Sequence, residues 1–142
     1  MNYLRDDNNI FISLEEGDEV FESLYAVIDS EKIETGWING LGTCKDTEIA
    51  FYNLGTKEYE KKIFDEHLEI TNLTGNVTKS EGNPFLHLHI TLSDCKYNAF
   101  GGHLFKAIIT GACEIMIIVS HKSINRSYSN SVGLCLWDLK ND

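Results

Sequence analysis

The sequence predicts an α+β fold: a single compact domain, spanning residues 1–142, with a mainly antiparallel β-sheet of six to eight strands and one main helix near the N-terminus. Two observations support this prediction. Apolar residues recur at helical spacing between residues 18 and 32, whereas from residue 36 onward they alternate with polar residues, as they do in strands. Short loops join these strands, and the sequence supplies none of the helical crossovers that a parallel sheet needs.

The expected helix follows a short strand at residues 11–14. Gly17 and Asp18 offer a helix start, with Asp18 as the N-cap residue. The helix is expected to run to Lys32 and to pack one apolar face against the core. That face consists of Val20, Phe21, Leu24, Val27 and Ile28.

The remaining chain is expected to form strands and tight turns. Two alternating runs on either side of a turn at Gly55 predict an antiparallel hairpin. Gly75 indicates a bulge or a close approach of two backbones, and Gly111 is expected to divide a long strand region or to form a bulge in it. The expected strand regions are 46–53, 58–64, 68–77, 85–92, 104–119 and 132–139.

The charge balance limits the class of partner. Twelve Lys and Arg residues against 22 Asp and Glu residues give a formal net charge of −10, which disfavours direct nucleic-acid binding. The first residues lack the basic-then-apolar pattern of a signal peptide, and the longest apolar run, Ile115–Val119, is too short to span a bilayer. Four well-separated cysteines without a C-x-x-C pair are typical of free thiols in a reducing compartment. We therefore expect a cytoplasmic protein without a membrane partner.

A pair of histidines in the strand region 85–92 carries the most specific chemical signal. Alternate residues of a strand point to opposite faces, so the apolar residues of Leu-His-Leu-His-Ile are expected to be buried, while His87 and His89 share the other face. Their side chains are then about 6–7 Å apart along the strand. His103 follows Gly101 and Gly102, a pair that allows a tight turn and a close backbone approach. Where the chain folds back, His103 lies on a strand beside the first two histidines.

Three imidazoles with open coordination positions suit a divalent metal ion, and Zn²⁺ is the expected one. The open positions would hold water or a small anionic ligand. Without an ion, the trio would form a pH-sensitive cluster, because neighbouring imidazoles resist simultaneous protonation. Glu114 lies in a largely apolar strand region and has two interpretations. It orients a ligand histidine, or it is a paired or solvated carboxylate, and the second interpretation is favoured.

The order of several motifs resembles the plants-and-prokaryotes conserved (PPC) domain, in its stand-alone prokaryotic form. The motifs are Leu14–Asp18, Ile38–Gly42, Leu73–Val77, Pro84–His89, Gly101–Leu104 and Ala112–Ile115. The resemblance implies a compact domain around a mainly antiparallel sheet that assembles as a homotrimer. It also implies that the histidine-bearing segments lie together and that His87, His89 and His103 are the metal ligands. The DNA contact of the plant proteins comes from a separate Arg-Gly-Arg core, which this sequence lacks.

Three function classes follow, in order of preference. The first is a trimeric PPC-type binding domain that holds a divalent metal through the three histidines. The second is a metal-dependent enzyme, in which the ion activates a water molecule and Glu114 is the candidate base. The third is a DNA-associated regulator that acts through partners, because a trimer carrying about −30 charges repels DNA by itself.

Overall fold

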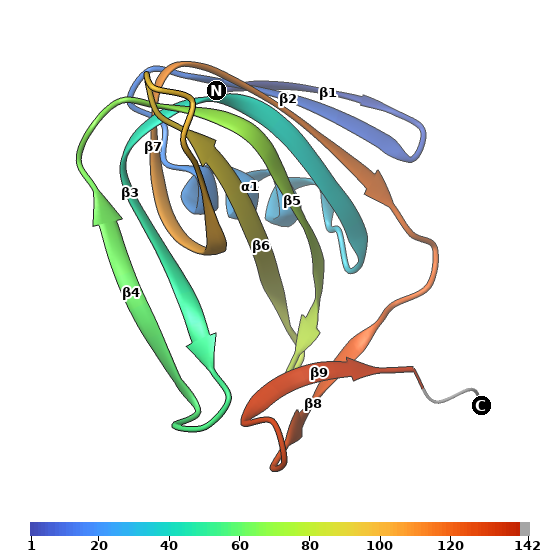
Figure 1. Ribbon diagram of the computed structural model, residues 1–142. Helices are drawn as coiled ribbons and strands as arrows, with labels where there is room; N and C mark the ends of the chain where they lie inside the picture. Colours follow the sequence, from blue (N-terminus) through green and yellow to red (C-terminus); the bar gives the residue numbers. More distant parts are fainter. Residues whose placement is uncertain (140–142) are drawn as a thin grey trace.

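The computed structural model describes residues 1–139 as nine strands and one helix (Figure 1). The strands are β1 (Asn2–Asp6), β2 (Asn9–Glu15), β3 (Gly36–Asn53), β4 (Glu58–Phe64), β5 (Leu68–Ser80), β6 (Asn83–Ser93), β7 (Ala99–Val119), β8 (Asn125–Ser129) and β9 (Leu134–Asp138), and the helix is α1 (Val20–Glu31). The α+β class, the antiparallel pairing and the position of the helix are confirmed. The helix has only 12 residues, fewer than are needed to cross a membrane.

Four of the strands close into a ring. β3 pairs with β5, β5 with β6, β6 with β7, and β7 again with β3, and all four pairings are antiparallel. The long strands β3 and β7 bend around this ring, as Figure 1 shows. β2 and β1 extend the sheet from β7, and β4 extends it from β3. The hairpin of β8 and β9 joins β5 through one parallel bridge between Lys79 and Asn125.

The core lies between α1 and the inner face of the sheet. Leu24 and Ile28 of α1 are buried in one cluster with Leu88 of β6 and Ile117 of β7. α1 contacts β7 and β6, so the helical apolar face covers the strands that carry the histidines. The predicted core role of this face is confirmed, because Val20, Leu24, Val27 and Ile28 are buried and Phe21 is partly buried.

The predicted helix start needs a correction. α1 begins at Val20, and its N-cap residue is Glu19, whose carboxylate accepts a hydrogen bond from the backbone N–H of Glu22 at 2.9 Å. Asp18 instead accepts a hydrogen bond from the backbone N–H of Glu15 at 2.8 Å, within the preceding turn. The longer side chain of Glu19 also accepts from the backbone N–H of Ala107 at 3.2 Å, which ties the start of the helix to β7.

Two glycines allow close contacts between strands. A Cβ atom at Gly75 would overlap the carbonyl oxygen of His87, so the predicted close backbone approach is confirmed and lies beside a candidate ligand. β7 is continuous through Gly111. Residues 110–112 of β7 lie opposite the single residue Thr43 of β3, because Gly42 pairs with Cys113 and Cys44 with Ile109. Gly111 therefore forms part of a bulge and does not divide the strand.

The sheet has more strands than the six to eight expected, because β1 and β8 were not predicted. All five residues of β1 are exposed, and β8 contains three exposed and two half-buried residues. Neither segment has the apolar alternation that marks a half-buried strand. β1 forms one edge of the sheet, and β8 lies between β5 and the last strand, β9. Sequence periodicity therefore gives little signal for these two strands.

Candidate functional site

The three predicted histidines lie together on the outer face of the ring of strands. The alternation predicted for β6 is confirmed, because Leu86, Leu88, Ile90 and Leu92 are buried while His87 is half-buried and His89 exposed. His89 pairs directly with His103 of β7. A Cβ atom at Gly102 would lie 2.7 Å from the carbonyl oxygen of Ala50, so this glycine lets β7 approach β3 closely next to His103.

The imidazole rings converge. The ring centroids of His87 and His89 are 5.2 Å apart, those of His87 and His103 are 5.1 Å apart, and those of His89 and His103 are 5.4 Å apart. One ring nitrogen from each histidine lies within 4.8 Å of the corresponding nitrogens of the other two. Because a Zn–N bond is about 2.0–2.1 Å long, small side-chain rotations bring nitrogens at this separation onto one ion.

The surroundings keep the imidazoles neutral. Burial is the main cause that lowers the pKa of His87 to about 4, and the positive charge of Arg126 and the neighbouring His89 lower it further. Burial, followed by the charges of the other two histidines, also lowers the pKa of His103 to about 4. His89 is the most exposed of the three, but neighbouring atoms remove part of the water around its ring, and this desolvation lowers its pKa. Near neutral pH all three rings therefore offer lone pairs, which is the form that binds a metal ion.

An aromatic group lies on one side of the cluster. The ring centroid of His103 is 5.0 Å from that of Tyr59 and 4.9 Å from that of Phe105. Tyr59 is in β4 and stands opposite Tyr52 of β3, with their ring centroids 4.9 Å apart. The sequence did not identify these residues as part of a site, because it does not show that β3 pairs with both β4 and β7.

A cationic side chain lies on the other side of the cluster. The guanidinium of Arg126, in β8, lies 4.7 Å from the ring centroid of Phe85. It donates hydrogen bonds to Thr78 Oγ1 at 2.8 Å and to Asn76 Oδ1 at 2.9 Å. Thr78 pairs with Phe85, and Asn76 pairs with His87. Arg126 is therefore beside the histidine cluster. Sequence analysis did not place it there, because residue 126 is far from all three histidines along the chain.

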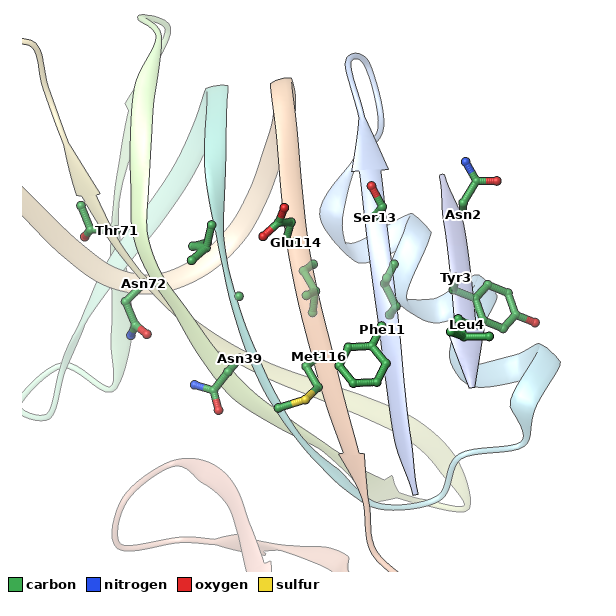
Figure 2. A pocket seen from close by; sticks show the side chains of 14 residues that line it. Asn2, Tyr3, Leu4, Phe11, Ser13, Asn39, Thr71, Asn72, Glu114 and Met116 are labelled. Atoms are coloured by element: carbon green, nitrogen blue, oxygen red, sulfur yellow. The ribbon is translucent and has the colours of Figure 1, made fainter. Parts of the chain in front are cut away.

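The other predicted candidates lie elsewhere. Glu114 is exposed and pairs with Leu41 of β3, whereas His103 pairs with Ala50, nine residues farther along the same strand. It lines a separate hollow of about 740 Å³ on the sheet face, shown in Figure 2 together with Phe11 and Met116. This position supports the solvated-carboxylate interpretation of Glu114. It also removes the candidate base of the enzyme hypothesis from the histidine cluster.

The protein is thus a closed ring of antiparallel strands with three histidines that converge on its outer face. The chain belongs to the Plants and Prokaryotes Conserved (PCC) domain family, also called PPC, whose family model matches residues 1–121. The predicted resemblance is confirmed. Among curated protein sequences, none matches this chain significantly.

Solved structures of similar proteins share the fold over nearly the whole chain. A Bacteroides thetaiotaomicron protein, described as a candidate DNA-binding protein, is 36% identical with a TM-score of 0.93, and 96% of each chain is covered. AF0104 from Archaeoglobus fulgidus, described as a metal-containing protein, is 31% identical with a TM-score of 0.84, and 91% of each chain is covered. A PPC protein from Pyrococcus horikoshii is 29% identical with a TM-score of 0.86, and the match covers 99% of this chain and 95% of that one.

Proposed function

We propose that this protein is a PPC-type binding domain that holds one divalent metal ion, Zn²⁺, through His87, His89 and His103. The observation that carries the proposal is the convergence of three neutral imidazoles, with one nitrogen of each within 4.8 Å of the others. Imidazole nitrogen is a borderline ligand that suits zinc and its neighbours in the first transition row, and three such ligands leave positions for water or an anion. The description of the Archaeoglobus relative as metal-containing supports the same proposal.

Metal analysis of purified variants tests this site. We expect about one zinc per chain in the wild-type protein, and a strongly reduced content when His87, His89 or His103 is replaced by alanine, because two imidazoles hold the ion much more weakly than three. His67→Ala and His121→Ala are matched controls. Both side chains are exposed, and they contact Thr110 and Asn8 rather than the cluster. Equal metal content in all five variants would remove the site.

We also propose that the protein assembles as a homotrimer. The exposed outer sheet face supports this, because large apolar side chains there lack cover within one chain. Among them, Phe11 is 46% exposed, Trp37 45% and Leu41 55%. Light scattering at micromolar concentration is expected to give three times the chain mass, and Phe11→Glu is expected to lower it. A monomer mass for the wild-type protein would contradict the proposal.

A DNA-associated role is the second candidate, favoured by the description of the Bacteroides relative. The net charge of −10 per chain opposes direct contact with phosphates, so such a role needs a basic partner. Binding of the isolated protein to duplex DNA is the discriminating measurement. Salt-sensitive binding without a partner would show that the surface charge has been misjudged, and no binding is the expected result.

For the compartment, we propose the cytoplasm. All four cysteines are free thiols, and Cys44 and Cys113 are buried. Burial raises the pKa of the Cys113 thiol to about 12 and also raises that of Cys44, so these two thiols stay protonated and inert. Free cysteines throughout are typical of a reducing compartment. Thiol titration of protein purified without reductant is expected to find four thiols per chain, and fewer would argue for an oxidising one.

A further inference from the structure

Arg126 is a half-buried cation whose hydrogen-bond partners within residues 1–139 are all neutral. Its three partners are the hydroxyl of Thr78, the side-chain amide oxygen of Asn76 and the backbone carbonyl of Cys135, at 2.8, 2.9 and 2.8 Å. Within residues 1–139, no carboxylate forms an ion pair with it. The other arginine, Arg5, pairs with Glu31 at 2.9 Å. In a chain with 22 acidic residues, a cation held this way is unusual, because a buried charge is normally matched by an opposite one.

The position of this charge next to the histidines needs an explanation. Arg126 lies beside His87, and its positive charge disfavours a second positive charge on that ring. The same repulsion acts against a divalent cation bound by the cluster. A fixed guanidinium beside a metal site therefore weakens the site, unless an anion lies between the two cations.

The guanidinium of Arg126 has free N–H groups and a fixed orientation, both of which suit the binding of such an anion. In the part of the chain that the structure describes, Thr78, Asn76 and Cys135 use three of its five N–H groups, which leaves two for a ligand. Contacts with both β5 and β9, together with the ring of Phe85, fix the plane of the group. A planar fork held in one orientation matches the two oxygens of a carboxylate better than a lysine does.

Aromatic rings on the opposite side of the histidine cluster indicate the chemical character of the rest of the ligand. Beyond His103 lie the rings of Tyr59 and Phe105, whose centroids are within 5.0 Å of the imidazole. A ligand with its charge at Arg126 would extend its other end toward these rings. This arrangement favours an organic anion with an apolar body over a small inorganic ion.

We propose that Arg126 is an anion-binding residue that holds the carboxylate of a small organic acid between its guanidinium and the metal ion at the histidine cluster. The inference rests on the proposed metal site and assigns its ligand class. Residue 126 lies outside residues 1–121, which the family model matches.

Benzoate is a suitable probe, because it combines one carboxylate with an apolar ring. The Co²⁺-loaded protein is titrated with benzoate, and the visible spectrum of the metal reports its binding. We expect Arg126→Gln to keep the metal and to weaken benzoate binding about tenfold or more, since charged hydrogen bonds are lost. We also expect the variant to bind the metal more tightly than the wild type when no anion is present, because one repelling charge is gone. A purely structural role for Arg126 would not tighten metal binding.

Two control variants separate the charge of Arg126 from its place in the C-terminal hairpin. Lys57 donates a hydrogen bond to the carbonyl oxygen of Asn130 at 2.6 Å, so Lys57→Gln loosens the same hairpin and removes one positive charge elsewhere. Arg5→Gln removes the only other guanidinium. Both are expected to bind benzoate as the wild type does. Equal weakening by Lys57→Gln and Arg126→Gln would overturn the inference in favour of hairpin closure.

The outcomes distinguish this inference from the proposed function. Where the wild-type protein binds Co²⁺ but benzoate leaves its spectrum unchanged, the inference fails and the metal site stands. Where Arg126→Gln binds benzoate as tightly as the wild type, the inference also fails. Where no metal binds to the wild-type protein, the proposed function fails. Calorimetric titration of the metal-free protein with benzoate then tests Arg126 alone, and equal affinities of wild type and Arg126→Gln would reject it.

Discussion

Replacing Gly75 by alanine is expected to damage the fold and the histidine site together. The new Cβ atom would overlap the carbonyl oxygen of His87 and would lie 2.9 Å from the carbonyl carbon of His87 and from the Cα atom of Leu88. Carbon atoms in good contact are about 3.5–4.0 Å apart, so β5 and β6 must separate by at least about 0.6 Å at this point. The atoms that the new Cβ meets all belong to the backbone of His87 and Leu88, so no side-chain rotation relieves the overlap.

The cost follows from two contributions. Overpacking in a well-packed region typically costs about 1–3 kcal/mol. Each backbone hydrogen bond weakened by the separation adds about 1 kcal/mol. We expect Gly75→Ala to lose about 2–4 kcal/mol of unfolding free energy, which lowers Tm by roughly 6–12 °C for a domain of this size. Metal affinity is expected to fall as well, because His87 moves with its backbone.

Thermal unfolding of the metal-free protein measures the first effect, and zinc titration measures the second. Gly55→Ala is the matched control, because the only atom near its added Cβ is the side-chain oxygen of Asn53, at 3.3 Å. That control is expected to retain the wild-type Tm within about 2 °C, as surface substitutions usually do. A wild-type Tm and zinc affinity for Gly75→Ala would refute the reasoning that the two backbones are in contact here.

Three further expectations test the energetics of the fold. Metal-free protein should lose stability as the pH falls from about 6.5 toward 4, because the pKa values of His87 and His103 are lowered to about 4, so that in this window these two rings take up protons only in the unfolded chain. The urea midpoints of unfolding at pH 7 and pH 5 measure this loss, and the double variant His87→Gln/His103→Gln should show a smaller difference between the two midpoints. An unchanged difference would exclude the histidines as its cause. Thr43→Val should raise the free energy of unfolding, measured by urea titration, by about 1 kcal/mol. The reason is that the buried Oγ1 atom of Thr43 has no hydrogen-bond partner within the part of the chain that the structure describes. A destabilised variant would mean that a water molecule satisfies this hydroxyl. Leu88→Ala should cost about 2–5 kcal/mol in the same assay, because Leu88 is fully buried behind the histidines, and a loss below 1 kcal/mol would contradict the assigned core.

The sequence by itself determined which face is buried in the helix and in the histidine-bearing strand β6. Strand side chains alternate between two faces, so the pattern Leu-His-Leu-His in β6 places both histidines outside and both leucines inside, whichever strands lie next to it. The helical stripe beginning at Val20 is determined in the same local way. Gly75 could also be assigned from the sequence, because a glycine within a strand pattern indicates a close backbone approach.

The tertiary structure decided which residues become neighbours. His103 faces His89 because β6 pairs with β7 in one particular register, and a shift by one residue would turn its side chain to the other face. Arg126 reaches the cluster because the hairpin of β8 and β9 docks on β5. Periodicity describes each strand relative to its own two faces and contains no information about its partner. Contacts between distant segments are selected by the packing of the whole sheet, and for that reason the arginine beside the histidines became apparent only in the folded protein.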